Sequence, residues 1–142
     1  MRARRPRILF LCTGNACRSQ MAEGWARELH GDRYEIHSAG IVAHGRNPHA
    51  VEAMDALGVD IGDQESTPLA ALGELEFDAV ITVCDHAAQN LPELAGAPLR
   101  LHEPFPDPPT LAEARSEGEA AACYREVAER IGAWVRELPD RL

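Results

Sequence analysis

One short segment restricts the possible folds of this chain more than any other part of it. The apolar run at residues 8–11 passes through a loop into a helical stretch at residues 19–30, and the loop begins with Cys12 and carries Arg18 six residues later. Loop amides at the start of a helix form a cradle for an oxyanion, because their unpaired N–H groups and the helix dipole favour negative charge. The same field stabilises a thiolate, and an arginine can bond two oxygens of a tetrahedral anion. We therefore expect Cys12 to be a nucleophile.

Short apolar runs alternate with longer amphipathic stretches along the rest of the chain. This pattern is typical of βαβ units and predicts an α/β fold with a parallel sheet. The continuous apolar run at residues 78–83 indicates a central strand that is buried on both faces. The expected strands cover residues 7–11, 34–39, 78–83 and 99–102. The expected helices cover residues 19–30, a stretch from Pro48 to a stop at Gly58, a short stretch after Pro68, and residues 111–138.

Several residues with reactive or polar side chains lie at or just beyond the ends of these strands. They are Cys12, Ser38, Cys84 and, in a proline-rich loop after the fourth strand, Asp107. Ligands of open parallel sheets bind beyond the carboxyl ends of the strands, so we expect these residues on one rim of the sheet. His86, close to Cys84 in the sequence, is either a solvated loop residue or a group that tunes that thiol.

Length and composition limit the classes of function. A chain of 142 residues is long enough for one domain, 1–142, with its own core. The formal net charge of −9 argues against nonspecific binding to nucleic acid, and residues 1–6 are expected to form a flexible tail. The apolar run at residues 8–11 is too short for a membrane span or a signal peptide, so we expect a cytoplasmic protein without a membrane partner. In that compartment all four cysteines start as thiols, namely Cys12, Cys17, Cys84 and Cys123.

Several blocks of the sequence resemble one known family. The matching blocks are LCTGNACRSQMAEGW at residues 11–25, Ser38-Ala39-Gly40, His44-Gly45 with Asn47-Pro48, Val83-Cys84-Asp85, and Phe105-Pro106-Asp107-Pro108. In these blocks the chain resembles the arsenate reductases built on the low-molecular-weight protein tyrosine phosphatase fold. The resemblance implies a three-layer, flavodoxin-like α/β fold with a four-stranded parallel sheet.

Two chemistries occur on that fold, and the sequence favours one of them. The phosphatases usually carry tyrosines just after the Asp-Pro pair, where this chain has Pro109 and Thr110. The reductases carry a second thiol at the end of the third strand, where this chain has Cys84. The resemblance therefore implies reduction of arsenate to arsenite for arsenic detoxification. It also allows a weak residual phosphatase activity. The alternatives are a phosphatase that hydrolyses phosphomonoesters through a phospho-Cys12 intermediate and a binder of oxyanions without catalysis.

The resemblance also assigns roles to individual residues. Cys12 would attack arsenate, and Asp107 would protonate the departing oxygen. Cys84 would then attack the Cys12 sulfur of the arsenylated enzyme, which expels arsenite and leaves a Cys12–Cys84 disulfide. Ser19 would donate a hydrogen bond to the Cys12 sulfur. The loop would orient the oxyanion and take up its charge, and its oxyanion-binding residues are Thr13, Gly14, Asn15, Ala16, Cys17, Arg18 and Ser19.

Asn15 is expected to shape the loop. Asn tolerates the left-handed backbone conformation well, and Ser38 is a supporting residue that can bond to it. In some family members, residues at the places of Asn15, Glu23 and Ser38 help to hold a potassium ion, but a further carboxylate of that site falls at or near Thr67 here. We therefore assign no metal and no tightly bound cofactor.

One position departs from the thioredoxin-coupled members. They place a third thiol seven residues after the second, where this chain has Leu91. Three routes to the reduced enzyme stay open: thioredoxin or a glutaredoxin-like protein reduces Cys12–Cys84 directly, a low-molecular-weight thiol resolves the arsenylated Cys12, or Cys17 or Cys123 takes the missing place. Without such a role, Cys17 is a packing residue and Cys123 belongs to the core.

Overall fold

A four-stranded parallel sheet forms the centre of the molecule. The computed structural model describes residues 4–94 and 98–142. Its strands are β1 (Arg7–Cys12), β2 (Glu35–Gly40), β3 (Ala79–Thr82) and β4 (Leu99–His102). They are all parallel and lie in the order β2-β1-β3-β4, which confirms the expected α/β class.

Burial of the strands follows their position in the sheet. Every residue of β3 is buried, and so is every residue of β1 after Arg7. A central parallel strand is covered on both faces, which explains why residues 78–83 read as a continuous apolar run. The edge strand β4, in contrast, exposes three of its four residues.

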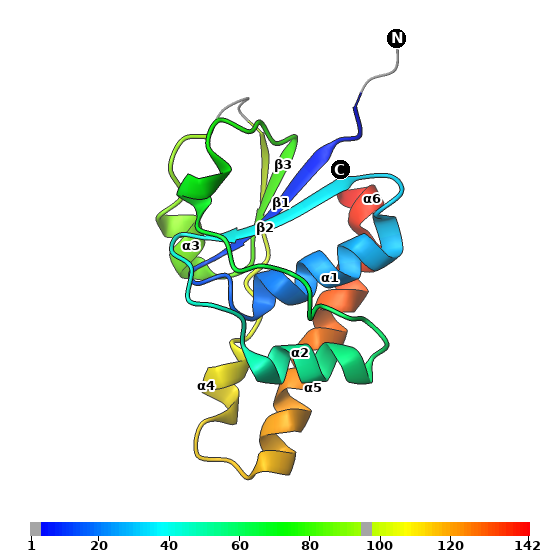
Figure 1. Ribbon diagram of the computed structural model, residues 1–142, viewed down its shortest axis with the longest axis vertical. Helices are drawn as coiled ribbons and strands as arrows, with labels where there is room; N and C mark the ends of the chain where they lie inside the picture. The colour runs from blue at the N-terminus through cyan, green and yellow to red at the C-terminus, as the bar shows by residue number, and fades with distance from the viewer. Residues whose placement is uncertain (1–3, 95–97) are drawn as a thin grey trace.

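Three helices pack against one another beside the sheet (Figure 1). They are α1 (Arg18–His30), α2 (Pro48–Ala56) and the long α5 (Glu117–Arg136), which contacts both of the others. Asn47 begins α2 by accepting a hydrogen bond from the His49 amide at 2.9 Å, and Pro48 occupies the first turn. The shorter elements are the 3-10 helix η1 (Leu69–Leu72), α3 (Asp85–Gln89), α4 (Pro108–Ala112) and α6 (Leu138–Arg141).

The single final helix expected over residues 111–138 is wrong. The chain instead forms α4, breaks over residues 113–116, and starts again as α5. Ala114 adopts a left-handed conformation with φ of 61°, through which a right-handed helix cannot continue. Ser116 then accepts a hydrogen bond from the Glu119 amide at 3.2 Å, while its hydroxyl bonds the Glu119 carboxylate at 2.9 Å. This cap provides an independent start for α5.

The described part of the expected tail contacts the body of the protein. Residues 1–3 lie outside the described residues. Arg4 pairs with Asp78 through Nη1 and Oδ2 at 2.8 Å, and Arg5 donates to the Gly31 carbonyl. The Pro6 carbonyl accepts a hydrogen bond from the Glu35 amide at 2.9 Å. These contacts place residues 4–6 along the amino ends of β2 and β3.

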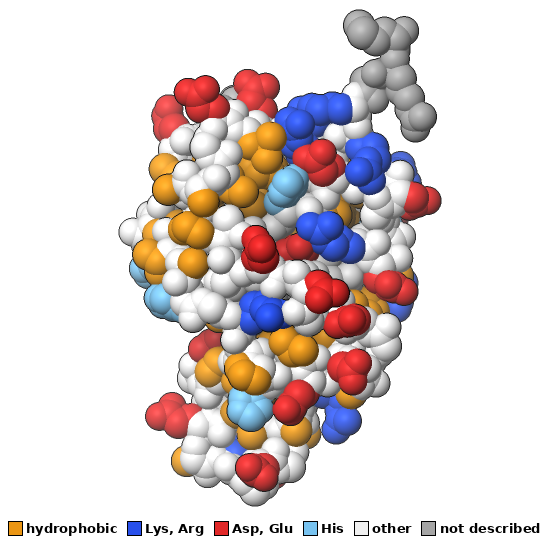
Figure 2. All heavy atoms as spheres, viewed as in Figure 1, with side chains coloured by type: hydrophobic (Ala, Val, Ile, Leu, Met, Phe, Trp, Pro, Cys, Tyr) orange, Lys and Arg blue, Asp and Glu red, His pale blue; other side chains and the backbone are white. Residues whose placement is uncertain are grey.

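Charged side chains of both signs are interspersed on the face shown in Figure 2. Arginines there have acidic neighbours, and no single basic surface dominates the view. Across residues 4–94 and 98–142, none of the helices combines the length and the apolar character needed to span a membrane.

Candidate active site

The loop between β1 and α1 is held from outside through its carbonyl groups. The carbonyl oxygens of Cys12, Thr13, Gly14 and Ala16 accept hydrogen bonds at 2.9–3.1 Å from amides in the segment 41–47. A trans peptide unit points its N–H opposite to its C=O, so the amides that follow these carbonyls point away from that segment. The loop therefore presents N–H groups on its inner side, where α1 begins, and this is the arrangement that binds an anion.

Asn15 shapes this loop from within, as the sequence predicts. Its φ of 50° lies in the left-handed region, and its side chain is fully buried. The amide Nδ2 donates to the hydroxyls of Ser19 at 2.8 Å and Ser38 at 2.9 Å, and Oδ1 accepts from the Thr67 amide at 2.8 Å. The three bonds tie the loop to α1, to β2 and to the segment before η1.

Cys12 lies at the end of β1 with its sulfur directed at α1. The thiol is buried, and the Ser19 hydroxyl lies 2.9 Å from its sulfur. Because Ser19 already accepts the Asn15 amide proton, its own proton is available to the sulfur. Thiol, hydroxyl and amide thus form a connected set at the floor of the loop.

The hydrogen-bond chain continues from Ser38 to a buried carboxylate. Ser38 donates to Glu23 Oε1 at 2.5 Å, and Arg27 Nε donates to Glu23 Oε2 at 2.8 Å. Both carboxylate oxygens of Glu23 are therefore bonded, one to a hydroxyl and one to a guanidinium, as a buried charge requires. No cluster of three or more His, Cys, Asp or Glu side chains suited to a metal ion occurs in the described ranges.

Arg18 connects the loop to the proline-rich segment after β4. Its Nη1 donates to the Phe105 carbonyl at 2.9 Å, and its Nη2 lies 3.4 Å from Asp107 Oδ1. Asp107 also accepts a hydrogen bond from the Thr110 hydroxyl at 2.6 Å. The structure therefore brings together an arginine and a carboxylate that lie 89 residues apart in the sequence.

Cys84 lies beside the same loop. β1 and β3 are neighbours with Leu11 opposite Thr82, and the Val83 amide donates to the Leu11 carbonyl at 2.9 Å. The chain following β3 therefore leaves the sheet next to the chain following β1. The Cys84 thiol is buried, its sulfur lies 3.3 Å from the Thr13 hydroxyl, and it accepts the Ala87 amide at 3.4 Å.

Cys17 in the loop and Tyr124 in α5 are two further buried titratable groups near the site. Burial, together with the negative charge of Asp107, raises the pKa of the Cys17 thiol to about 12, and Arg18 only partly opposes this. Burial also raises the pKa of Tyr124. The hydrogen bond from Asn47 lowers this pKa, and the interactions with Cys17 and Asp107 raise it further. The Tyr124 hydroxyl accepts that bond from Asn47 Nδ2 at 3.0 Å.

Tyr124 was not among the residues predicted for the site, because the resemblance points to tyrosines only directly after the Asp-Pro pair. The signal was its place on a helical stripe in α5, which continues through Val127, Ile131 and Val135 and is buried throughout. Cys123 precedes it and is only partly buried, with its sulfur 3.7 Å from the Leu111 carbonyl. The expectation that Cys123 belongs to the core is therefore wrong: it lies on α5, and its side chain faces α4.

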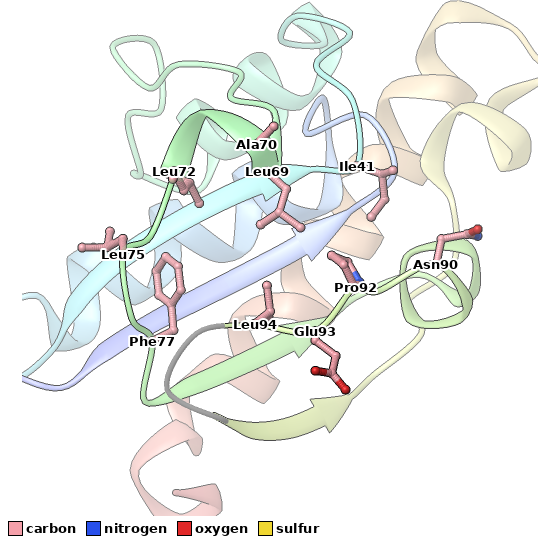
Figure 3. A pocket seen from close by; sticks show the side chains of 11 residues that line it. Ile41, Leu69, Ala70, Leu72, Leu75, Phe77, Asn90, Pro92, Glu93 and Leu94 are labelled. Atoms are coloured by element: carbon pink, nitrogen blue, oxygen red, sulfur yellow. The ribbon is translucent and has the colours of Figure 1, made fainter.

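An apolar cavity of about 380 Å³ lies on another part of the molecule (Figure 3). On one side it is lined by η1 and the segment after it, and on the other by the connection after α3. The side chains that face it in Figure 3 include Leu69, Leu72, Phe77, Pro92 and Leu94. Leu91 belongs to the same connection and packs partly buried against the core. Apolar packing therefore occupies the region where a third thiol would lie.

Comparison with known proteins agrees with this geometry. The family described as low molecular weight phosphotyrosine protein phosphatase matches residues 7–142. The chain belongs to this family. Among curated relatives of this phosphatase-family chain, an arsenate reductase of Halalkalibacterium halodurans is 44% identical over 136 residues, and one of Bacillus subtilis is 43% identical over 136 residues. Each alignment covers 94% of this chain and 94% of the relative.

Solved structures of the phosphatase family share the fold. One, described as an arsenate reductase in the phosphate binding state, superposes with a TM-score of 0.80 at 28% identity and covers 96% of this chain and 98% of that one. Another, an arsenate reductase in oxidized state, gives a TM-score of 0.78 at 26% identity over 95% of this chain and 97% of that one. The resemblance and the fold class expected from the sequence are thereby confirmed.

Proposed function

We propose that this protein reduces arsenate to arsenite through an arsenylated Cys12 and a Cys12–Cys84 disulfide, for arsenic detoxification. The observation that carries the proposal is a second buried thiol beside the oxyanion loop, with Thr13 of that loop 3.3 Å from the Cys84 sulfur. A hydrolase needs one nucleophile, whereas a two-electron reduction needs two thiols. The relatives named arsenate reductase, at 43% and 44% identity over nearly their whole length, add independent support.

The oxyanion would bind on the inner side of residues 13–19. The loop amides and the Arg18 guanidinium would orient it and take up the charge that grows as Cys12 attacks. Arg18 now bonds the Phe105 carbonyl and Asp107, which lie at the rim of the same loop. When the anion binds in the loop, Arg18 would exchange these bonds for bonds to the anion. Asp107 would protonate the departing oxygen, and Ser19 would hold the Cys12 thiolate.

The reducing step conserves atoms and electrons. The Cys84 sulfur attacks the Cys12 sulfur, the S–S bond forms, and the S–As bond breaks with its electron pair on arsenic. Arsenic is reduced from As(V) to As(III) while the two thiols are oxidised to a disulfide. An external thiol then supplies two electrons to return both cysteines to thiols.

The external reductant is thioredoxin, a glutaredoxin-like protein or a low-molecular-weight thiol in a cytoplasmic compartment. Leu91 offers no third sulfur and packs against the core, so no relay carries the disulfide to the surface by that route. Cys17 is a poor substitute because a thiol with a pKa of about 12 stays protonated at neutral pH. We therefore favour direct attack of the external thiol on the Cys12–Cys84 disulfide. Attack on the arsenylated Cys12 would need no Cys84, and unimpaired turnover of Cys84→Ser would reveal it.

Phosphomonoester hydrolysis is the second candidate function. The family itself and the pairing of Arg18 with Asp107 across the loop favour it. The same nucleophile, anion cradle and acid would form a phospho-Cys12 intermediate, which water would hydrolyse without help from Cys84. We expect this activity to be weak beside arsenate reduction.

The test is turnover of Cys84→Ser with each reductant offered separately. Wild type should reduce arsenate repeatedly with at least one of them, whereas Cys84→Ser should lose catalytic turnover but keep slow hydrolysis of p-nitrophenyl phosphate. Cys123→Ser is the matched control. The Cys123 sulfur contacts the Leu111 carbonyl and not the loop, so we expect wild-type turnover, whereas a loss would give Cys123 the place of the third thiol. Unimpaired multiple turnover in Cys84→Ser would refute the role of Cys84. Hydrolysis of the ester by wild type without arsenate reduction would favour the phosphatase.

A further inference from the structure

The side chains of Cys84, Thr13 and His86 lie in series, each within hydrogen-bond distance of the next. The Thr13 hydroxyl is 3.3 Å from the Cys84 sulfur and 3.0 Å from His86 Nδ1. Cys84 is buried and His86 is exposed, so the series runs from a thiol inside the protein to an imidazole at its surface. Thr13 stands between them because it is the residue directly after Cys12 in the oxyanion loop.

Local structure fixes this arrangement. Cys84 is the N-cap of α3, and its sulfur accepts the Ala87 amide at 3.4 Å. His86 follows in the first turn of the same helix, and its carbonyl accepts the Asn90 side-chain amide at 2.8 Å. The pairing of β1 with β3 brings Thr13 to the start of that turn.

The His86 imidazole bonds Thr13 and not the carboxylate next to it in the sequence. The Asp85 carboxylate is engaged by His102 of β4, with Nε2 and Oδ1 2.9 Å apart. The Thr13 hydroxyl from the oxyanion loop is the polar group bonded to His86 Nδ1, and behind it lies the Cys84 thiol. A neutral imidazole with its proton on Nε2 accepts a hydrogen bond at Nδ1.

We propose that His86 is a positioning residue that takes up the Cys84 proton through the Thr13 hydroxyl when Cys84 attacks Cys12. The inference rests on the proposed function and adds a residue to it. Cys84 S–H gives its proton to the Thr13 oxygen, Thr13 O–H gives its own to His86 Nδ1, and the new thiolate forms the S–S bond. The displaced electron pair reduces arsenic, and solvent later removes the proton from the exposed imidazolium.

The second step, the attack of Cys84 on Cys12, requires that the Cys84 thiol lose its proton. A thiolate, not a thiol, is the nucleophile in thiol–disulfide chemistry. The buried sulfur is within hydrogen-bond reach of Thr13 and the Ala87 amide, and neither is a base. An imidazole can accept a proton at a free ring nitrogen and release it to solvent again, so His86 can serve as the base in each cycle.

The experiment separates the second step from the first. One equivalent of arsenate is mixed with reduced enzyme without a reductant, and the rate of Cys12–Cys84 disulfide formation is followed by quenching and peptide mapping from pH 6 to 9. Hydrolysis of p-nitrophenyl phosphate, which requires Cys12 but not Cys84, is measured in parallel. The variants are His86→Gln, which keeps a hydrogen-bonding side chain but cannot take up a proton, and His86→Ala.

We expect disulfide formation in His86→Gln to be about 100-fold slower at pH 7, the usual scale of general base catalysis, and to recover toward pH 9 as solvent hydroxide replaces the base. Ester hydrolysis should stay at the wild-type rate. Added imidazole should restore much of the rate in His86→Ala, because the site is exposed. His102→Gln is the matched control, since it removes an imidazole that contacts α3 without touching Thr13, and it should behave as wild type.

Other results would overturn the relay. A wild-type rate of disulfide formation in His86→Gln would show that no proton passes through this histidine. An equal loss in His102→Gln, or an equal loss of ester hydrolysis, would show that the substitution acts through the structure of α3. Failure of the wild-type enzyme to form the disulfide with arsenate would instead contradict the proposed function, so the two failures are distinguishable.

Discussion

The Ser19 hydroxyl lies 2.9 Å from the Cys12 sulfur and at the same time accepts a hydrogen bond from Asn15. The Asn15 bond fixes the orientation of the hydroxyl, so its proton is directed to the sulfur. A hydrogen bond to an ionised acceptor stabilises it by about 1.5–3 kcal/mol. In the proposed mechanism this bond from α1 would support Cys12 during its attack, together with the loop amides.

Substitution Ser19→Ala should slow the chemistry of Cys12 by about tenfold to 100-fold, as expected from the loss of one charge-assisted hydrogen bond. Alkylation of Cys12 by iodoacetate at pH 7 and hydrolysis of p-nitrophenyl phosphate should fall together, since both depend on the thiolate. Ser116→Ala, which removes the cap of α5 far from the loop, is the control and should leave both rates unchanged. Wild-type alkylation in Ser19→Ala would contradict this assignment.

Asp107→Asn should impair ester hydrolysis according to the leaving group. An amide cannot protonate a departing oxygen, so the rate with p-nitrophenyl phosphate should fall by about 100-fold or more. A substrate whose leaving group needs little protonation, 2,4-dinitrophenyl phosphate, should lose much less. If both esters lose the same factor, Asp107 acts through its contact with Arg18, where Nη2 and Oδ1 lie 3.4 Å apart, and not as an acid.

The raised pKa of Cys17 predicts a loss of stability at high pH. The folded protein holds the thiol proton up to a pKa of about 12, against 9.0 for an unperturbed cysteine. The unfolded chain therefore loses that proton first, and the stabilisation is complete below pH 9 and lost as the pH rises from 9 toward 12. Between pH 8 and pH 10 the free energy of unfolding should fall by about 1 kcal/mol more in wild type than in Cys17→Ala.

Urea denaturation at both pH values measures this difference. Tyr124 contributes to the pH dependence of both proteins in the same direction, because burial raises its pKa. Cys17 adds only a smaller part to that rise, so most of the Tyr124 contribution cancels in the comparison. The variant will be less stable at every pH since it leaves a small cavity. Parallel pH profiles for the two proteins would show that the Cys17 thiol ionises freely in the fold.

Much of the fold could be predicted because its signals are local. Alternating apolar runs predicted all four strands, and the run before Cys12 predicted where the loop begins. Helix α3 was missed, since a helix of five residues is too short to display a periodic pattern. The break before α5 had a signal in Ser116 and Glu119, a capping box, but the apolar periodicity across it dominated the interpretation.

The place of the candidate site in the fold was predictable from the sequence, but its contacts were predictable only in part. The rule that ligands bind beyond the carboxyl ends of parallel strands predicted that Cys12 and Cys84 would share a rim. The bond between Thr13 and His86 depends on the register of β1 against β3 and on the first turn of α3, and neither is written in local sequence. The approach of Tyr124 likewise depends on how α5 packs across the loop.

Packing between α1 and α5 gives the last prediction, because it depends on one glycine. A Cβ atom at Gly132 would lie 2.6 Å from Cε2 of Trp25, whose indole is held by a hydrogen bond from Nε1 to the Ala128 carbonyl at 2.9 Å. Neither the ring nor the helix backbone can yield without losing that bond. Gly118 lies in the same helix with open space around it.

Gly132→Ala should therefore destabilise the protein by about 1–3 kcal/mol through overpacking, despite the better helix propensity of alanine. Gly118→Ala should be neutral or should stabilise by up to about 1 kcal/mol, because only the propensity changes. Urea denaturation of both variants measures the two effects. If Gly132→Ala were as stable as Gly118→Ala, the two helices would have to move apart easily, and α5 would not be a firm support for α1.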